Sequence, residues 1–99
     1  MKLLWTQESL EQLNSIEDYI AKDSLERAVK FIDQIIELAE TLLDNPQMGR
    51  IVPEIANPVI RELILKKYRI VYRINENCIE ILTVFEGHRL MRTDAFFER

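Results

Sequence analysis

The 99-residue chain is long enough for one hydrophobic core but not for two, so residues 1–99 are predicted to form a single α+β domain. Its one cysteine, Cys78, excludes an internal disulfide, and no apolar run approaches the ~18 residues of a membrane span, so a cytoplasmic protein is predicted. The net charge of −4 argues against broad nucleic-acid binding, but residues 50–99 carry nine Lys/Arg against seven Asp/Glu, so an anion-facing surface is expected there.

Two amphipathic helices are predicted in the first half of the chain. The first begins after Thr6, a plausible N-cap, and shows apolar residues at helical spacing. A capping box formed by Asp23 and Glu26 is expected to start the second, which Pro46 ends. The connection is short, so the pair should form an antiparallel hairpin. The second helix carries an apolar stripe of Leu25, Ala28, Val29, Ile32, Ile35, Ile36, Ala39, Leu42 and Leu43.

The second half of the chain reads as β-structure. A proline-containing loop at residues 46–58 precedes three predicted strands, and Lys66-Lys67 and residues 75–77 are short enough to be hairpin connections. An antiparallel meander follows, with the helices on one face and the other face left to a partner or to water. The predicted strands are residues 59–65, 68–74 and 79–85.

Alternation along residues 68–74 assigns the two faces of the middle strand. Tyr68 and Tyr72, with the isoleucines between and after them, are predicted to face the core, and Arg69 and Arg73 to face the other way. Adjacent like charges on one strand destabilise it unless carboxylates or a ligand compensate. Glu62 and Glu80 on the flanking strands are the structural candidates for that compensation.

The sequence offers little of the machinery of common enzymes. One His and one Cys cannot make a zinc site, two glycines cannot build a phosphate-binding loop, and no cofactor is expected. Lys66-Lys67 is predicted to be a solvated turn, and Cys78 to be a packing residue. A basic set remains as the candidate binding surface: Arg50, Arg61, Arg69, Arg73, Arg89 and Arg92.

The same region could serve a metal-independent ribonuclease. Arginines would neutralise the charge that develops on phosphate, and Glu54 or His88 would exchange protons. For His88 a hydrogen-bonded or exposed loop histidine is the structural alternative.

Several stretches resemble the RelE/ParE family of toxins from bacterial type II toxin–antitoxin systems, and they cover nearly the whole chain. The most specific are the loop containing Pro46, Gly49 and Arg50 that leads to VPE, and RELILKKYRIVYR in the strands. The resemblance implies a β-α-α-β-β-β fold with a first strand at residues 2–6. It also implies a cognate antitoxin that wraps and neutralises the toxin in a hetero-oligomer.

The family divides by mechanism. RelE-like members cleave mRNA on the ribosome, whereas ParE-like members poison DNA gyrase. The chain resembles the ParE branch more closely, so a gyrase inhibitor of a plasmid-stabilisation system is predicted. Two alternatives stay open: a ribosome-dependent mRNA endonuclease with Glu54 as general base, Arg69 as phosphate stabiliser and His88 as general acid, or an inactive toxin that only binds its antitoxin.

Overall fold

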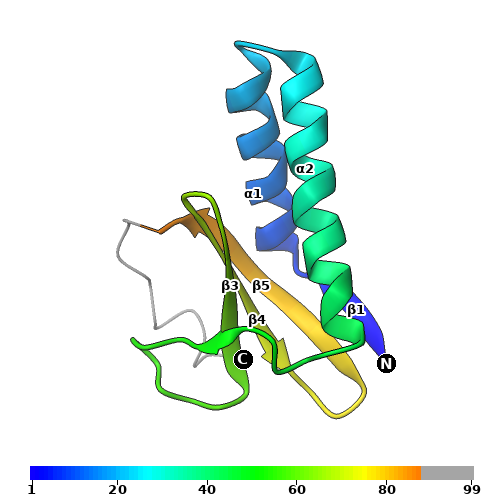
Figure 1. The fold of residues 1–99 in the computed structure, drawn as a ribbon, viewed down its shortest axis with the longest axis vertical. Helices are drawn as coiled ribbons and strands as arrows, with labels where there is room; N and C mark the ends of the chain where they lie inside the picture. The colour runs from blue at the N-terminus through cyan, green and yellow to red at the C-terminus, as the bar shows by residue number, and fades with distance from the viewer. Residues whose placement is uncertain (88–99) are drawn as a thin grey trace.

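A computed structural model describes residues 1–87 of the chain. The helices form an antiparallel pair that stands against one face of a twisted sheet (Figure 1). The elements, in chain order, are β1 (Lys2–Trp5), α1 (Gln7–Ala21), α2 (Leu25–Glu40), a 3-10 turn η1 (Thr41–Leu43), β2 (Arg50–Ile51), β3 (Ile60–Leu65), β4 (Tyr68–Ile74) and β5 (Cys78–Glu86).

Side-chain caps fix where both helices begin. The Thr6 hydroxyl accepts the backbone N–H of Ser9 at 3.1 Å, which confirms the predicted N-cap of α1. The same hydroxyl donates to the carbonyl of Leu82 at 2.9 Å, so the cap also ties α1 to β5. The prediction for α2 was wrong by one residue: Ser24, not Asp23, is the N-cap, and its hydroxyl accepts the N–H of Arg27 at 3.2 Å. No helix within residues 1–87 is long and apolar enough to cross a membrane.

The five strands lie in the order β1-β5-β4-β3-β2. The hairpins β3–β4 and β4–β5 are antiparallel, as predicted. The strand β1 confirms the first strand that the family resemblance implied at residues 2–6. It pairs parallel with β5, because the helical hairpin carries the chain back across the sheet. The two-residue strand β2 adds a further edge beside β3, so the sheet is mixed.

A β-bulge allows β5 to serve both faces of the sheet. Val71 pairs with Thr83 and Tyr72 with Ile81, so Leu82 is the extra residue on β5. Ile81 and Val84 consequently both belong to the core under the helices, while Leu82 belongs to a cluster on the other face. The side chain of Gln12 on α1 accepts the N–H of Val84 at 2.6 Å beyond the bulge, which fixes the register of helix against strand.

The main core confirms the predicted inward face of β4: Tyr68, Ile70 and Tyr72 pack under the helices. Only part of the predicted apolar stripe on α2 is buried. Ala28, Ile35, Ala39 and Leu42 are buried, but Leu25 is 68% exposed. The stripe is therefore wider than the surface available to cover it.

The opposite face of the sheet is not left open as predicted. Val52 and Ile60 join Val71 and Leu82 in a second buried cluster, against which Ile55 packs. The loop at residues 52–59 thus covers part of this face and brings its own side chains onto it.

Gly49 occupies a position where no side chain fits. Its N–H donates to the hydroxyl of Tyr72 at 3.0 Å, and that hydroxyl donates to the carbonyl of Pro46 at 2.7 Å. A Cβ atom at Gly49 would lie 2.5 Å from the carbonyl oxygen of Glu62 and 2.7 Å from the Tyr72 hydroxyl. The loop therefore enters β2 directly against β3 and β4.

Gly49→Ala is expected to lower the free energy of unfolding by about 2 kcal/mol, because backbone must move to relieve the overlap. Urea denaturation of the two proteins measures the change. Gly87→Ala is the matched control, since its Cβ would come no closer than 3.3 Å to another heavy atom, the Cγ of Arg69. Equal stability of the two alanine variants would contradict the close approach.

Candidate functional site

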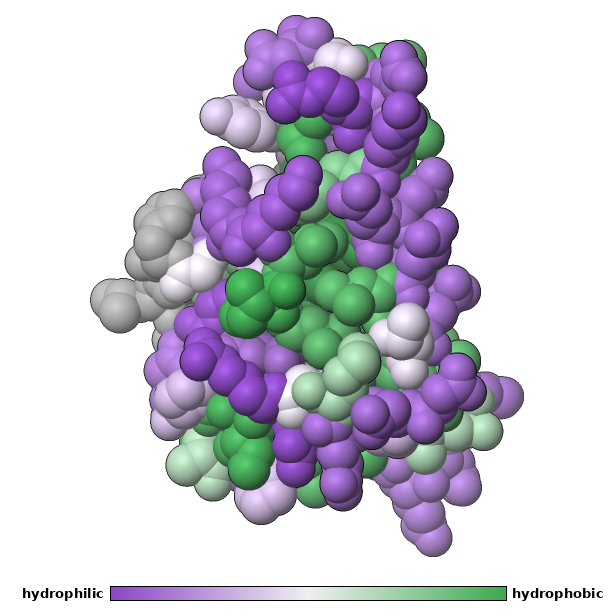
Figure 2. All heavy atoms as spheres, in the orientation of Figure 1, coloured by the Kyte–Doolittle hydropathy of each residue, from purple (hydrophilic) through white to green (hydrophobic). Residues whose placement is uncertain are grey.

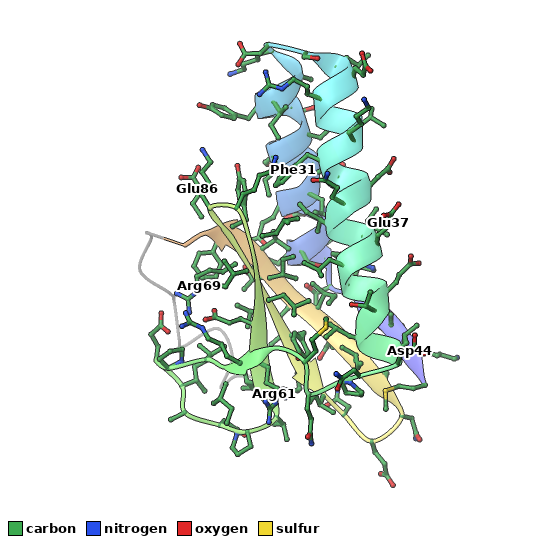
Figure 3. The ribbon with its side chains drawn as sticks, in the orientation of Figure 1. Phe31, Glu37, Asp44, Arg61, Arg69 and Glu86 are labelled. Atoms are coloured by element: carbon green, nitrogen blue, oxygen red, sulfur yellow. The ribbon has the colours of Figure 1, made fainter. Side chains whose placement is uncertain are left out.

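The candidate site lies on the sheet face away from the helices, where an alternating chain of charges crosses from the loop to the edge strand. Figure 3 shows Arg69 on the opposite side of the strands from Phe31 of α2. The chain of charges runs Glu54–Arg69–Glu62–Arg50 and joins the loop, β4, β3 and β2.

Arg69 is the centre of this arrangement. Its Nη1 and Nη2 donate to the two carboxylate oxygens of Glu54 at 2.7 and 2.9 Å, a bidentate pair. Its Nε donates to Glu62 at 2.6 Å. The guanidinium also lies 5.2 Å from the ring centroid of Phe85 on the neighbouring strand. With the Arg69 side chain only 8% exposed, little of the guanidinium is left for a ligand.

Glu62 is buried completely, and two arginines neutralise it. One carboxylate oxygen accepts Arg69 Nε, and the other accepts Arg50 Nε at 2.6 Å. The Arg50 side chain remains 60% exposed. Glu62 therefore compensates the positive charge of Arg69, as the sequence suggested. Arg50 is the solvent-exposed end of the charge chain.

The electrostatics of Glu54 follow from this geometry. The hydrogen bonds from Arg69 lower the pKa of its carboxyl from 4.5 to about 2, although burial acts in the opposite direction. The carboxylates in turn raise the pKa of Arg69, led by the hydrogen bond with Glu54. A carboxylate with so low a pKa is a weak base, so Glu54 is poorly suited to abstract a proton.

The structure separates the other predicted arginines. Arg61 lies on the helix side of β3, opposite Tyr72, and donates to the carbonyls of Pro58 at 2.9 Å and Gly49 at 3.0 Å. It thus holds the loop and is not beside Arg69. Arg73 pairs in register with Glu80 on the same side as Arg69. Arg89, Arg92 and His88 lie outside the described residues.

The trio proposed for a nuclease is therefore placed in part. Glu54 and Arg69 meet, as the ribonuclease hypothesis required, but they meet as a closed ion pair. A shallow cavity of about 330 Å³ lies beside Arg69, and its lining also includes Arg50, Gly87 and the β3–β4 turn but not Glu54. Within residues 1–87 there is no group of three His, Cys, Asp or Glu side chains that could hold a metal ion.

Sequence reasoning missed the double role of Glu62. The available signal was its position opposite Val71, two rungs from the Ile64–Arg69 pair, on the face that the alternation assigns to Arg69. That Arg50 also reaches Glu62 depends on β2, which no pattern in the sequence predicted.

Comparison with known proteins supplies a family for this geometry. The family model described as "ParE toxin of type II toxin-antitoxin system, parDE" matches residues 3–91. A solved structure titled "Chromosomal ParDE TA system from P. aeruginosa" superposes with a TM-score of 0.72 at 27% sequence identity. The match covers 87% of this chain and 95% of that one. No match was found among curated proteins.

Arg69→Met is expected to lower the free energy of unfolding by about 3 kcal/mol, because it leaves the buried Glu62 with only one partner. Adding Glu62→Leu should recover part of the loss by removing the stranded charge. Thermal or urea denaturation tests both. Lys30→Ala, which breaks the exposed pair with Glu26 at 3.2 Å, is the control and should change stability little. An Arg69→Met protein as stable as the control would refute the structural role.

The pH dependence of stability should carry the signature of Glu54. Its folded pKa is lower than its unfolded pKa, so its stabilising contribution is present above pH 4.5 and is lost as the pH falls towards about 2. The contribution is modest because the Glu54 side chain is 38% exposed and solvent screens the pair. Glu54→Gln should flatten the stability curve in that window, and an unchanged slope would contradict the assignment.

Proposed function

Because the chain belongs to the ParE toxin family of type II toxin–antitoxin systems, we propose that it arrests growth by binding DNA gyrase. The action is stoichiometric inhibition and not hydrolysis of a substrate. A cognate antitoxin neutralises the toxin in a hetero-oligomer, and both act in the cytoplasm.

One observation supports binding over cleavage most directly: among the described residues, the proposed general base and the proposed phosphate stabiliser are hydrogen-bonded to each other. Glu54 is held as a carboxylate by two hydrogen bonds from Arg69, and three of the five N–H groups of Arg69 are bound by Glu54 and Glu62. To bind phosphate, Arg69 would have to exchange Glu54 and lose both of these charge-assisted hydrogen bonds. A surface that only grips a partner has no such requirement.

The proposed contact set keeps all six arginines but gives them different roles. Arg50 is the exposed member at the sheet edge and is suited to meet an acidic partner surface. Arg69 and Arg61 act indirectly, by fixing strands and loop. Arg73 lies on the same sheet face as Arg50, and Arg89 and Arg92 extend the set beyond the described residues.

Ribosome-dependent mRNA cleavage is the second candidate, and a specific observation favours it. Glu54 and Arg69 are hydrogen-bonded to each other, and Arg69 lines a cavity together with Arg50 and Gly87. For cleavage, the substrate phosphate would have to displace Glu54 from Arg69 before the arginine could stabilise the transition state.

A gyrase supercoiling assay with purified protein tests the proposal. Micromolar toxin should inhibit supercoiling of relaxed plasmid. Arg50→Gln should weaken the inhibition at least threefold, since it removes the exposed charge at the edge, whereas Lys2→Gln on β1 should leave it unchanged.

Supercoiling that is unaffected at micromolar protein would overturn the gyrase proposal. Growth arrest that persists without gyrase inhibition would then favour the nuclease, and Glu54→Gln should abolish it. Normal growth on expression without a partner would instead identify an inactive toxin that only pairs with an antitoxin.

A further inference from the structure

A second cavity, on the helix side of the molecule, has a composition unlike the rest of this acidic protein. It measures about 530 Å³ and lies between α1, α2 and the β3–β4 turn, a size typical of ligand and anchor pockets. Its apolar and aromatic lining comes from Tyr19, Ile20, Phe31 and Tyr68. Figure 2 shows apolar side chains exposed in the angle between the helix pair and the sheet, with hydrophilic ones around them.

Cations gather around this cavity. Arg27, Lys30, Lys66 and Lys67 line it, against one carboxylate, Asp23. Residues 1–49 contain only four Lys/Arg among ten Asp/Glu, and three of the four are placed here. They are Arg27 and Lys30 in the lining, and Lys22, whose ammonium lies 5.9 Å from the Tyr19 ring centroid.

The two lysines of the turn are held over the aromatic lining. Lys66 Nζ lies 5.4 Å from the Phe31 ring centroid, and Lys67 Nζ lies 5.8 and 5.9 Å from the Tyr68 and Tyr19 rings. No ion pair joins either lysine to a carboxylate of residues 1–87. Their positive charge is therefore presented towards the cavity without neutralisation from the described part of the chain.

The backbone conformation at Lys66 decides which substitution the turn will tolerate. Lys66 has a φ of 53°, in the left-handed region where glycine or asparagine sits at lower cost. An asparagine at this position should therefore be tolerated at least as well as the lysine. The predicted solvated turn is confirmed, since Lys66 and Lys67 are both exposed turn residues, and it also frames the cavity.

We propose that this pocket docks an acidic peptide segment of a protein partner, with one large apolar side chain inserted over Phe31 and Tyr68. Carboxylates that flank the anchor would meet Lys66, Lys67 and Arg27. The lining favours a peptide over a free phosphate ligand, because it offers one arginine for bidentate contact and a largely apolar floor. On the proposed function, that partner is the antitoxin, so this inference rests on neutralisation by a bound protein.

Selection from a phage-displayed library of random 16-residue peptides tests the proposal and does not require the partner to be identified first. The full chain is the bait. Enriched peptides should carry Asp or Glu around a Leu, Phe or Trp, and their affinity should fall severalfold between low and high salt. Lys66→Asn should weaken binding at least fivefold while thermal stability is kept or raised, because asparagine tolerates the left-handed turn.

Two further variants separate pocket from net charge. Tyr19→Asn removes an exposed ring of the rim and should also weaken binding, whereas Lys2→Asn makes the same charge change on β1 and should not. Peptides that lack acidic residues, peptides bound equally by all variants, or no enrichment at all would each overturn the proposal. If ATP or inorganic triphosphate displaces the peptides at a lower concentration than free peptide does, the pocket would be assigned to phosphate instead.

Gyrase inhibition measured on the Tyr19→Asn protein keeps the two proposals distinct, because Tyr19 lines this pocket and not the cavity beside Arg69. Lost peptide binding with intact inhibition supports the docking pocket. Peptide binding that fails while wild-type protein still inhibits gyrase overturns the pocket and leaves the proposed function standing.

Discussion

The ion pairs of Arg69 hold together parts of the chain that hydrophobic packing alone would not align. A guanidinium keeps its charge at any physiological pH, so its burial in the sheet requires carboxylates in fixed places. Glu62 supplies one from the neighbouring strand, and Glu54 supplies the other from the loop. To reach Arg69, the loop must cross the sheet face, and this crossing brings Val52 and Ile55 over Val71 and Leu82. Arg50 then completes the chain from the edge strand.

This constraint decides what the arginine face can do. A catalytic arginine must be able to exchange its partner for substrate, and a general base must hold a pKa near the working pH. In this chain the exchange would break the two hydrogen bonds between Arg69 and Glu54, and the pKa of the Glu54 carboxyl is about 2. A preformed, ion-paired surface disfavours catalysis but favours recognition, because it loses less conformational entropy when a partner binds. The charge chain and the aromatic floor of the lysine-framed pocket lie on opposite faces of the sheet, and the turn at Lys66 and Lys67 lines the cavities on both sides.

Most of the fold was predictable because its signals are local. Alternation of apolar and charged residues from Tyr68 to Ile74 places the strand and its two faces, and the two-residue turn at Lys66-Lys67 sets the β3–β4 hairpin. The cap of α2 was assigned to Asp23 instead of Ser24 because both residue types serve as caps and spacing alone does not choose between them.

The details of the site were less accessible to sequence because they depend on long-range geometry. Arg69 was correctly assigned to the face away from the helices, but its burial depends on a loop whose path no periodicity describes. The parallel pairing of β1 and the short strand β2 likewise depend on where the ends of distant elements meet. The lysine turn looked like ordinary solvated structure until the aromatic rings beneath it were placed.

We propose that this toxin acts by binding a protein and not by cleaving RNA. Mapping the 5′ ends of cellular mRNA before and after expression, together with plasmid topology from the same cells, tests it most directly. We expect relaxed plasmid and no new mRNA 5′ ends within the first minutes of growth arrest. New 5′ ends inside translated reading frames, with plasmid supercoiling unchanged, would contradict the claim.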